Sequence, residues 1–97
     1  MIASFADAAT EDLFHGRMTA RARRFPVEVA RLAVRKLDAL NAATEFEDLR
    51  SPPGNRLEAL RGDLRGLHSI RVNDQWRIVF RWRDAEATQV RLMDYHS

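Results

Sequence analysis

The chain has 97 residues, enough for one domain with a modest core, and its hydrophobic (45%) and charged (31%) fractions indicate a soluble globular protein. It contains no cysteine, which excludes disulfides and thiolate zinc sites, and no apolar run approaches the roughly 20 residues that span a bilayer. The formal charge is only +2 and the N-terminus lacks the features of a secretory signal, so we expect one cytoplasmic domain over residues 1–97 with no membrane association.

The first half of the chain is expected to be mainly helical. Residues 1–5 are short and apolar enough for an edge strand. Thr10, followed by acidic residues, begins a helical turn that Gly16 stops. Residues 17–25 are rich in arginine and form a basic connector or a short helix. The clearest helix runs from Pro26 to Ala43, because five apolar residues recur there at three- and four-residue spacing: Val29, Leu32, Ala33, Leu37 and Leu40.

The second half is expected to form strands. Ser51-Pro52-Pro53-Gly54 ends the helical part. Four strands are then predicted, over residues 56–61, 67–72, 76–82 and 88–95, with turns at 73–75 and 84–86. This order predicts an α+β domain in which N-terminal helices pack on one face of an antiparallel sheet of about four to five strands.

The strand at residues 76–82 alternates apolar residues with arginines, so its side chains fall on two faces. The core face should carry Trp76, Ile78, Phe80 and Trp82. The other should be an open face that carries Val79 with Arg77, Arg81 and Arg83, and Arg71 adds to the same kind of surface. Residues 50–97 hold nine basic and six acidic side chains, which suits an anionic partner such as RNA. An ordinary solvated face, and the arginine bias of a GC-rich genome, are the alternatives.

Metal-free RNA cleavage needs a base for the 2′-hydroxyl proton, an acid for the departing 5′-oxygen, and cations around the phosphoryl group. The second half offers candidates on strands that are expected to be neighbours: Glu58, Asp94, Tyr95 and His96 for proton transfer, and Arg61, Arg77 and Arg81 for charge. The three histidines lack ligand spacing, so no metal or other cofactor is expected. A terminal histidine that is merely exposed, beside an Asp–Tyr pair that only hydrogen-bonds, is the alternative.

Four segments carry a family resemblance: residues 37–44, residues 55–63, residues 69–78 and the terminal Asp94-Tyr95-His96. In this order, and in a chain of similar length, they resemble the HigB-type toxins of the RelE/ParE superfamily. The resemblance implies the toxin of a type II toxin–antitoxin pair, a ribosome-dependent endoribonuclease that cuts mRNA in the decoding site of the small subunit. It also implies a HigA-type antitoxin with a helix-turn-helix domain. The toxin would be linked to operator DNA only through this antitoxin.

The resemblance also implies roles for individual residues. Arg77 would hold the scissile phosphate, and Arg61 would contact a further phosphate or ribosomal RNA. The terminal catalytic cluster would be Asp94, Tyr95 and His96. Glu58 stands where some members have a histidine, so which group is base and which is acid stays open. A ParE-like inhibitor of DNA gyrase and a non-catalytic module that binds antitoxin or RNA are the competing interpretations.

Overall fold

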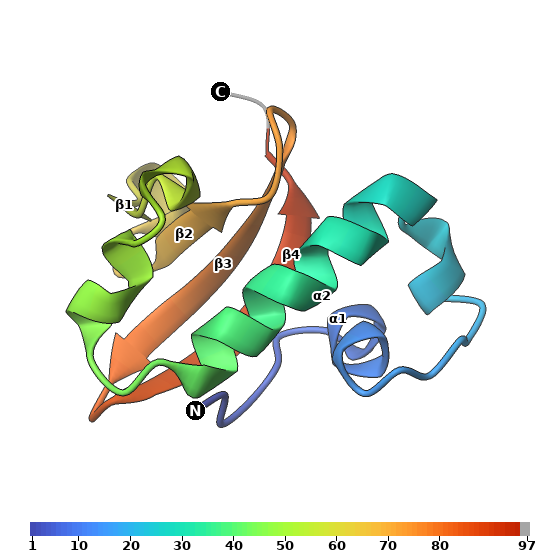
Figure 1. Cartoon of the computed structure of the whole chain (residues 1–97), viewed down its shortest axis with the longest axis horizontal. Helices are drawn as coiled ribbons and strands as arrows, with labels where there is room; N and C mark the ends of the chain where they lie inside the picture. Colours follow the sequence, from blue (N-terminus) through green and yellow to red (C-terminus); the bar gives the residue numbers. More distant parts are fainter. Residues whose placement is uncertain (96–97) are drawn as a thin grey trace.

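The computed structural model describes residues 1–95, which form an antiparallel sheet with two helices on one face (Figure 1). The helices are α1 (Ala8–Phe14) and α2 (Val27–Ala42). The strands are β1 (Glu58–Ala59), β2 (His68–Arg71), β3 (Trp76–Arg83) and β4 (Glu86–Asp94), and their order in the sheet follows the chain. The predicted α+β architecture, with helices followed by an antiparallel sheet, is confirmed.

The core lies between α2 and the sheet. The apolar spacing of α2 places its buried residues on one stripe: Val29, Ala33, Leu37 and Leu40. This stripe belongs to one buried cluster with side chains of the sheet that include Ile70, Ile78, Phe80, Val90 and Leu92. Burying a large apolar side chain contributes about 1.5–3 kcal/mol, so this layer fixes the sheet beneath the helix. Leu32, which the spacing also assigns to the stripe, is exposed at its edge.

The predicted edge strand at residues 1–5 is present only as two isolated parallel bridges to β4, Ile2–Ala87 and Phe5–Val90. Between them β4 carries a bulge, where the register between β3 and β4 shifts. Gln89 has a φ of 54° there, and its N–H donates to Ser4 Oγ over 3.0 Å. The bulge interrupts the ladder, so residues 1–5 pair with β4 at separate points and do not form a continuous strand.

The first predicted strand, residues 56–61, is wrong in its extent, because β1 contains only Glu58 and Ala59. Arg56 has a φ of 44°, in the left-handed region, and its carbonyl accepts a hydrogen bond from Arg77. Gly62, with a φ of 65°, turns the chain on the other side. The N-terminal flank of the predicted strand is therefore drawn out of the ladder, and on the other side the pairing ends after the bond from the Leu60 N–H to the Leu67 carbonyl oxygen.

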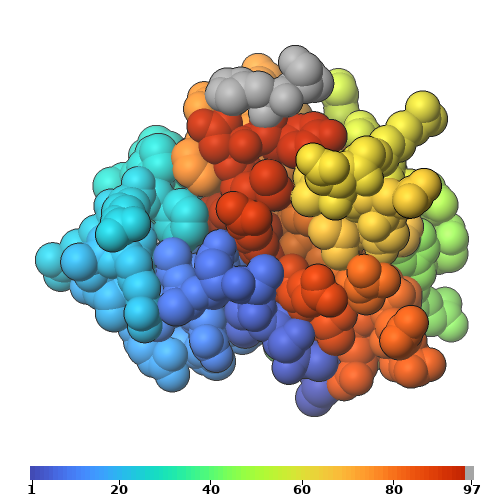
Figure 2. All heavy atoms as spheres, turned by 180° about the vertical axis from the view of Figure 1, so that it is seen from behind, coloured from blue at the N-terminus to red at the C-terminus, as the bar shows by residue number. Residues whose placement is uncertain are grey.

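The sheet face opposite the helices, seen in Figure 2, is less open than predicted. Val79 is 2% exposed and Arg77 9% exposed, so this part of the arginine face is buried. The connection between β1 and β2 (yellow in Figure 2) lies beside β3, and the guanidinium of Arg81 approaches to 3.6 Å of the position that a Cβ on Gly66 would take. Of the three β3 arginines only Arg83 is exposed, because the chain between β1 and β2 folds back on this face. None of the helices in residues 1–95 is long and apolar enough to cross a membrane.

Candidate functional site

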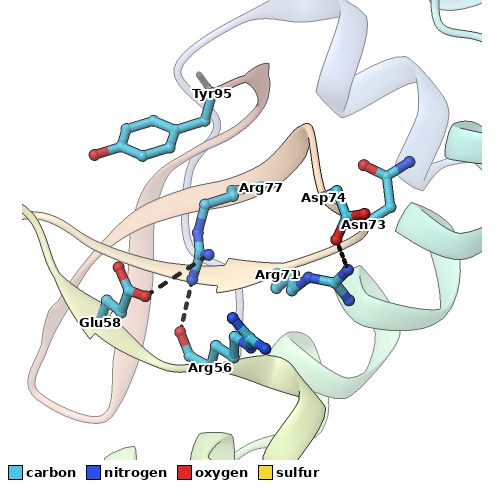
Figure 3. A pocket seen from close by; sticks show the side chains of 7 residues that line it. All are labelled: Arg56, Glu58, Arg71, Asn73, Asp74, Arg77 and Tyr95. Atoms are coloured by element: carbon cyan, nitrogen blue, oxygen red, sulfur yellow. Dashed lines mark hydrogen bonds and ion pairs between the residues drawn. The ribbon is translucent and has the colours of Figure 1, made fainter. Parts of the chain in front are cut away.

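A pocket of about 210 Å³ lies where β1, β2, β3 and the end of the described chain meet (Figure 3). All the residues that line it carry polar groups: Arg56, Glu58, Arg71, Asn73, Asp74, Arg77 and Tyr95. Three arginines therefore stand against two carboxylates in this lining, which leaves an excess of one positive charge. The positive charge of this pocket favours an anionic ligand.

Arg77 is the most firmly held cation of the pocket, since its side chain is only 11% exposed. Its Nε donates to Ser69 Oγ and its Nη2 donates to the carbonyl oxygen of Arg56, and each donor–acceptor distance is 2.6 Å. Burial lowers the pKa of the guanidinium, while the nearby Glu58 acts in the opposite direction. An arginine still keeps its charge at any physiological pH, so Arg77 supplies a fixed cation.

Glu58 and Tyr95 lie on the same side of Arg77, and Arg71 and Asp74 lie on the other (Figure 3). The Oε1 atom of Glu58 is 3.9 Å from Nη1 of Arg77, and the Glu58 side chain is 54% exposed, so its carboxylate is open to a ligand. The N–H of Tyr95 donates to the carbonyl oxygen of Gln75 over 2.7 Å, which ties the chain end to the turn between β2 and β3. A carboxylate is thus positioned next to one buried cation, and Tyr95 lines the same pocket.

The turn between β2 and β3 forms the other wall. Asn73 Oδ1 accepts from the N–H groups of Gln75 (2.9 Å) and Trp76 (2.8 Å), an arrangement that fixes a tight turn. Arg71 forms an ion pair with Asp74, whose side chain is 98% exposed. Such an exposed pair contributes little stability, so a phosphate can replace Asp74 as the partner of Arg71 at small cost.

Arg56 is a pocket residue that the sequence reasoning did not single out as a site. Its position depends on the neighbouring Asn55, which is 1% exposed and whose Nδ2 donates to the carbonyls of Leu49 (3.1 Å) and Ser51 (3.2 Å). Lys36 of α2 donates to Asn55 Oδ1. The only signal in the sequence is that Arg56 lies in the same short segment as Glu58.

The structure brings together four of the predicted site residues: Glu58, Arg71, Arg77 and Tyr95. Four others lie outside this pocket. Asp94 is paired with Trp76 across the sheet and accepts from Nε2 of Gln75 over 2.9 Å. Arg61 is exposed before the turn at Gly62–Leu64, while Arg81 and Arg83 lie further along β3, about 13 and 20 Å from Arg77 at the usual rise of a strand. His96 lies outside the described residues.

Residues 1–95 contain no group of three or more His, Cys, Asp or Glu side chains that could hold a metal ion. His68 of β2 is half-buried, and its burial lowers the pKa of the imidazole. Phe46 and Phe80 pack near its ring, with centroid distances of 4.8 and 6.2 Å. His68 is therefore part of the packing between the sheet and the segment of residues 46–50, and it does not line the pocket.

The sequence is similar to those of known toxins. The family model of the RelE-like toxin of the type II toxin–antitoxin system HigB matches residues 3–96. Toxin HigB-1 of Vibrio cholerae serotype O1 is 49% identical over 67 residues, which cover 69% of this chain and 70% of the relative. Endoribonuclease HigB of Proteus vulgaris is 36% identical over 61 residues, which cover 63% of this chain and 65% of the relative.

Solved structures show the same fold at low sequence identity. The YoeB dimer of Staphylococcus aureus matches with a TM-score of 0.58 and 19% identity, over 99% of this chain and 98% of that one. A heterotetrameric YoeB–YefM toxin–antitoxin complex from the same organism matches with a TM-score of 0.56 and 16% identity, over 100% of this chain and 99% of that one. At these identities the likeness establishes the fold alone.

Proposed function

Because the chain belongs to the HigB-like family of RelE-like toxins from type II toxin–antitoxin systems, we propose that it is an endoribonuclease that cuts mRNA in the decoding site of the ribosome. The relative from Proteus vulgaris is named an endoribonuclease. A single observation in this chain supports the same activity. It is the buried Arg77 guanidinium, held by Ser69 and Arg56 beside an accessible Glu58 carboxylate.

The proposed reaction begins with the 2′-hydroxyl of the nucleotide before the scissile bond. Glu58 accepts its proton, and the 2′-oxygen forms a bond to phosphorus as the bond from phosphorus to the 5′-oxygen breaks. A proton donor then neutralises the departing 5′-oxygen. The products are a 2′,3′-cyclic phosphate and a free 5′-hydroxyl, and the step needs no metal ion or cofactor.

The arginines stabilise the charge that develops on the phosphoryl oxygens. Nε and one N–H of Nη2 in Arg77 donate to protein acceptors, so Nη1, next to Glu58, and the second N–H of Nη2 can donate to a phosphoryl oxygen. Arg71 and Arg56 line the same pocket and supply further charge. Because Arg77 is fixed before substrate arrives, it needs little reorganisation during the reaction.

The proton donor is proposed to come from the chain end. Tyr95 lies in the pocket and its backbone is tied to Gln75, so its phenol is the donor best supported by position. His96 follows directly and is the second candidate, and Asp94 is proposed to orient this cluster from outside the pocket. In this proposal Glu58, which stands where the resemblance places a histidine in some family members, is the base, and the proton acceptor is therefore a carboxylate.

In the cell we propose that a HigA-type antitoxin with a helix-turn-helix domain neutralises the toxin and provides its link to operator DNA. We also propose that the exposed Arg61 and Arg83 and the half-buried Arg81 contact ribosomal RNA or mRNA outside the pocket. Family membership supports the first proposal, and the basic character of the second half of the chain supports the second.

Primer extension on mRNA held in translating ribosomes tests the proposed reaction. We expect Glu58→Gln to reduce cleavage by about 100-fold or more, since a positioned base contributes at least that much. Asp63→Asn is the matched control, because Asp63 is also exposed but does not line the pocket, and it should cut like the wild type.

Three results would contradict the proposal. Equal cleavage by Glu58→Gln and the wild type would remove Glu58 as the base. Equal cleavage of naked RNA without ribosomes would remove ribosome dependence. Intact mRNA together with inhibited DNA supercoiling would favour a ParE-like gyrase inhibitor.

A further inference from the structure

An apolar groove of about 190 Å³ lies between α1, the segment of residues 17–25 and the first turn of α2, in the blue and cyan part of the chain in Figure 1. We call it the α1–α2 groove. It is lined by Leu13, Met18, Ala22, Arg23, Phe25, Val27 and Ala30. None of these residues lines the pocket around Arg77.

The groove exposes large apolar side chains to solvent. Val27 is 72% exposed and Met18 is 65% exposed, the two highest values among the exposed large hydrophobic residues of the described chain. Both lie on the rim of one cavity whose inner wall includes the buried Leu13 and Ala22. Exposed apolar side chains that gather around a concavity are typical of a protein interaction site.

The rim is held in place by a buried carboxylate. Asp12 of α1 is 2% exposed; its Oδ2 accepts from Arg21 Nε (2.5 Å) and Thr19 Oγ1 (2.8 Å), and its Oδ1 accepts from Arg17 Nη1 (3.4 Å). These bonds span the segment that carries Met18. The groove is therefore an ordered surface, and a partner that binds it need not first order the segment.

The charge around the groove favours an acidic partner. Residues 17–25 contain four arginines and no carboxylate: Arg17, Arg21, Arg23 and Arg24. Asp12 offsets about one of these charges, and Glu11 is a second acidic neighbour of Arg21. Arg31 and Glu28 on α2 form an ion pair with each other. An excess of positive charge thus surrounds an apolar groove.

The size of the groove favours protein side chains over a small molecule. Pockets for drug-sized ligands usually measure about 300–1,000 Å³, which is larger than this cavity. An amphipathic segment that lays apolar residues into a groove and keeps charged residues at the rim fits both the volume and the charge.

We propose that the α1–α2 groove is the docking surface for the antitoxin, which inserts apolar side chains between Met18 and Val27 and sets carboxylates against Arg23 and Arg24. The proposal rests on the antitoxin partner that membership of a type II toxin–antitoxin family implies. It adds the place and the chemistry of the contact.

Calorimetric titration of the toxin with its full-length antitoxin tests the docking surface. Val27→Glu and Arg23→Glu should each weaken binding about tenfold or more, the size of effect that marks a central contact. Val27 is the first residue of α2, where an acidic side chain is tolerated, so the fold should persist. Leu32→Glu and Arg35→Glu are the controls: they also replace an exposed apolar residue and an arginine by glutamate, but at positions of α2 outside the groove. Both should bind the antitoxin like the wild type.

The outcomes separate the docking surface from other roles. Wild-type affinity in both groove variants would overturn the proposal. So would loss of ribosome binding with unchanged antitoxin affinity, which would make the groove an RNA contact. A wild-type dimer that Val27→Glu dissociates without changing antitoxin affinity would make it a self-association surface. Antitoxin affinity is measured without RNA, so failure of the proposed cleavage activity would not affect this result.

Discussion

Arg77 combines structural contacts with a proposed chemical role in one side chain. Two of its three nitrogens donate to Ser69 Oγ and to the Arg56 carbonyl, and these bonds join β3 to β2 and to the segment before β1. The third nitrogen lies beside Glu58. Variants of Arg77 therefore need a measurement of stability as well as a measurement of cleavage.

Arg77→Ala is expected to lower the free energy of unfolding by about 1–3 kcal/mol, because it leaves buried partners without their donor. Arg77→Lys keeps the charge but lacks the planar fork, so it should restore part of the stability while cleavage stays at least about tenfold below the wild type. Urea denaturation and primer extension measure the two quantities. If Arg77→Lys cleaves like the wild type, a point charge suffices and the fixed fork has no role in the reaction.

At the scale of single residues, the sequence predicts the identity of the pocket side chains better than their surroundings. Strand alternation places Arg77 on the face away from the core, and its role is only implied by the family resemblance. The burial of Arg77 depends on Ser69 and on the Arg56 carbonyl, eight and 21 residues away. Local periodicity carries no information about contacts of that kind, which is also why Arg56 was missed.

Among the elements, α1 and the segment after it are joined by one carboxylate. The pKa of Asp12 is lowered from 3.8 to about 2, mainly because the Arg21 side chain donates a hydrogen bond to its carboxylate. The hydrogen bond from Thr19 adds to the effect. A carboxyl group with a depressed pKa in the folded state contributes stability above its unfolded pKa. That contribution is lost as the pH falls through the folded value.

Asp12→Asn should therefore remove part of the dependence of stability on pH. The wild type should lose stability relative to the variant as the pH falls from about 4 to about 2, while their difference stays constant near neutral pH. Thermal unfolding followed by circular dichroism at stepwise pH values measures this. Asp38→Asn, an exposed carboxyl on α2, is the control that should run parallel to the wild type. A constant difference between Asp12→Asn and the wild type over the whole range would contradict the assignment.

Long elements with a clear period were predictable, and short elements held by distant contacts were not. α2 follows from its apolar spacing, and β3 and β4 follow from strand alternation. β1 was predicted too long because the left-handed Arg56 and its bond to Arg77 withdraw one flank from the sheet. The edge strand at residues 1–5 is reduced to two bridges by a bulge at Gln89. This bulge could not be predicted, because its residue with positive φ is not a glycine.

In the whole molecule, two surfaces with different chemistry share no residue. The pocket around Arg77 is lined by the second half of the chain, while the α1–α2 groove is lined by residues 13–30. The pocket is polar and carries proton-exchanging groups, and the groove is apolar with a basic rim. The two halves therefore suit different tasks, and substitutions in one surface should leave the other functional.

Growth assays with inducible toxin and antitoxin test this separation. Glu58→Gln should no longer arrest growth but should still copurify with the antitoxin, because Glu58 is exposed and lies outside the groove. Val27→Glu should arrest growth like the wild type but resist rescue by the antitoxin, because it changes only the groove. Their double variant should be harmless and should fail to copurify. If Glu58→Gln also loses the antitoxin, the antitoxin must reach the pocket, and neutralisation then acts by blocking the RNA site directly.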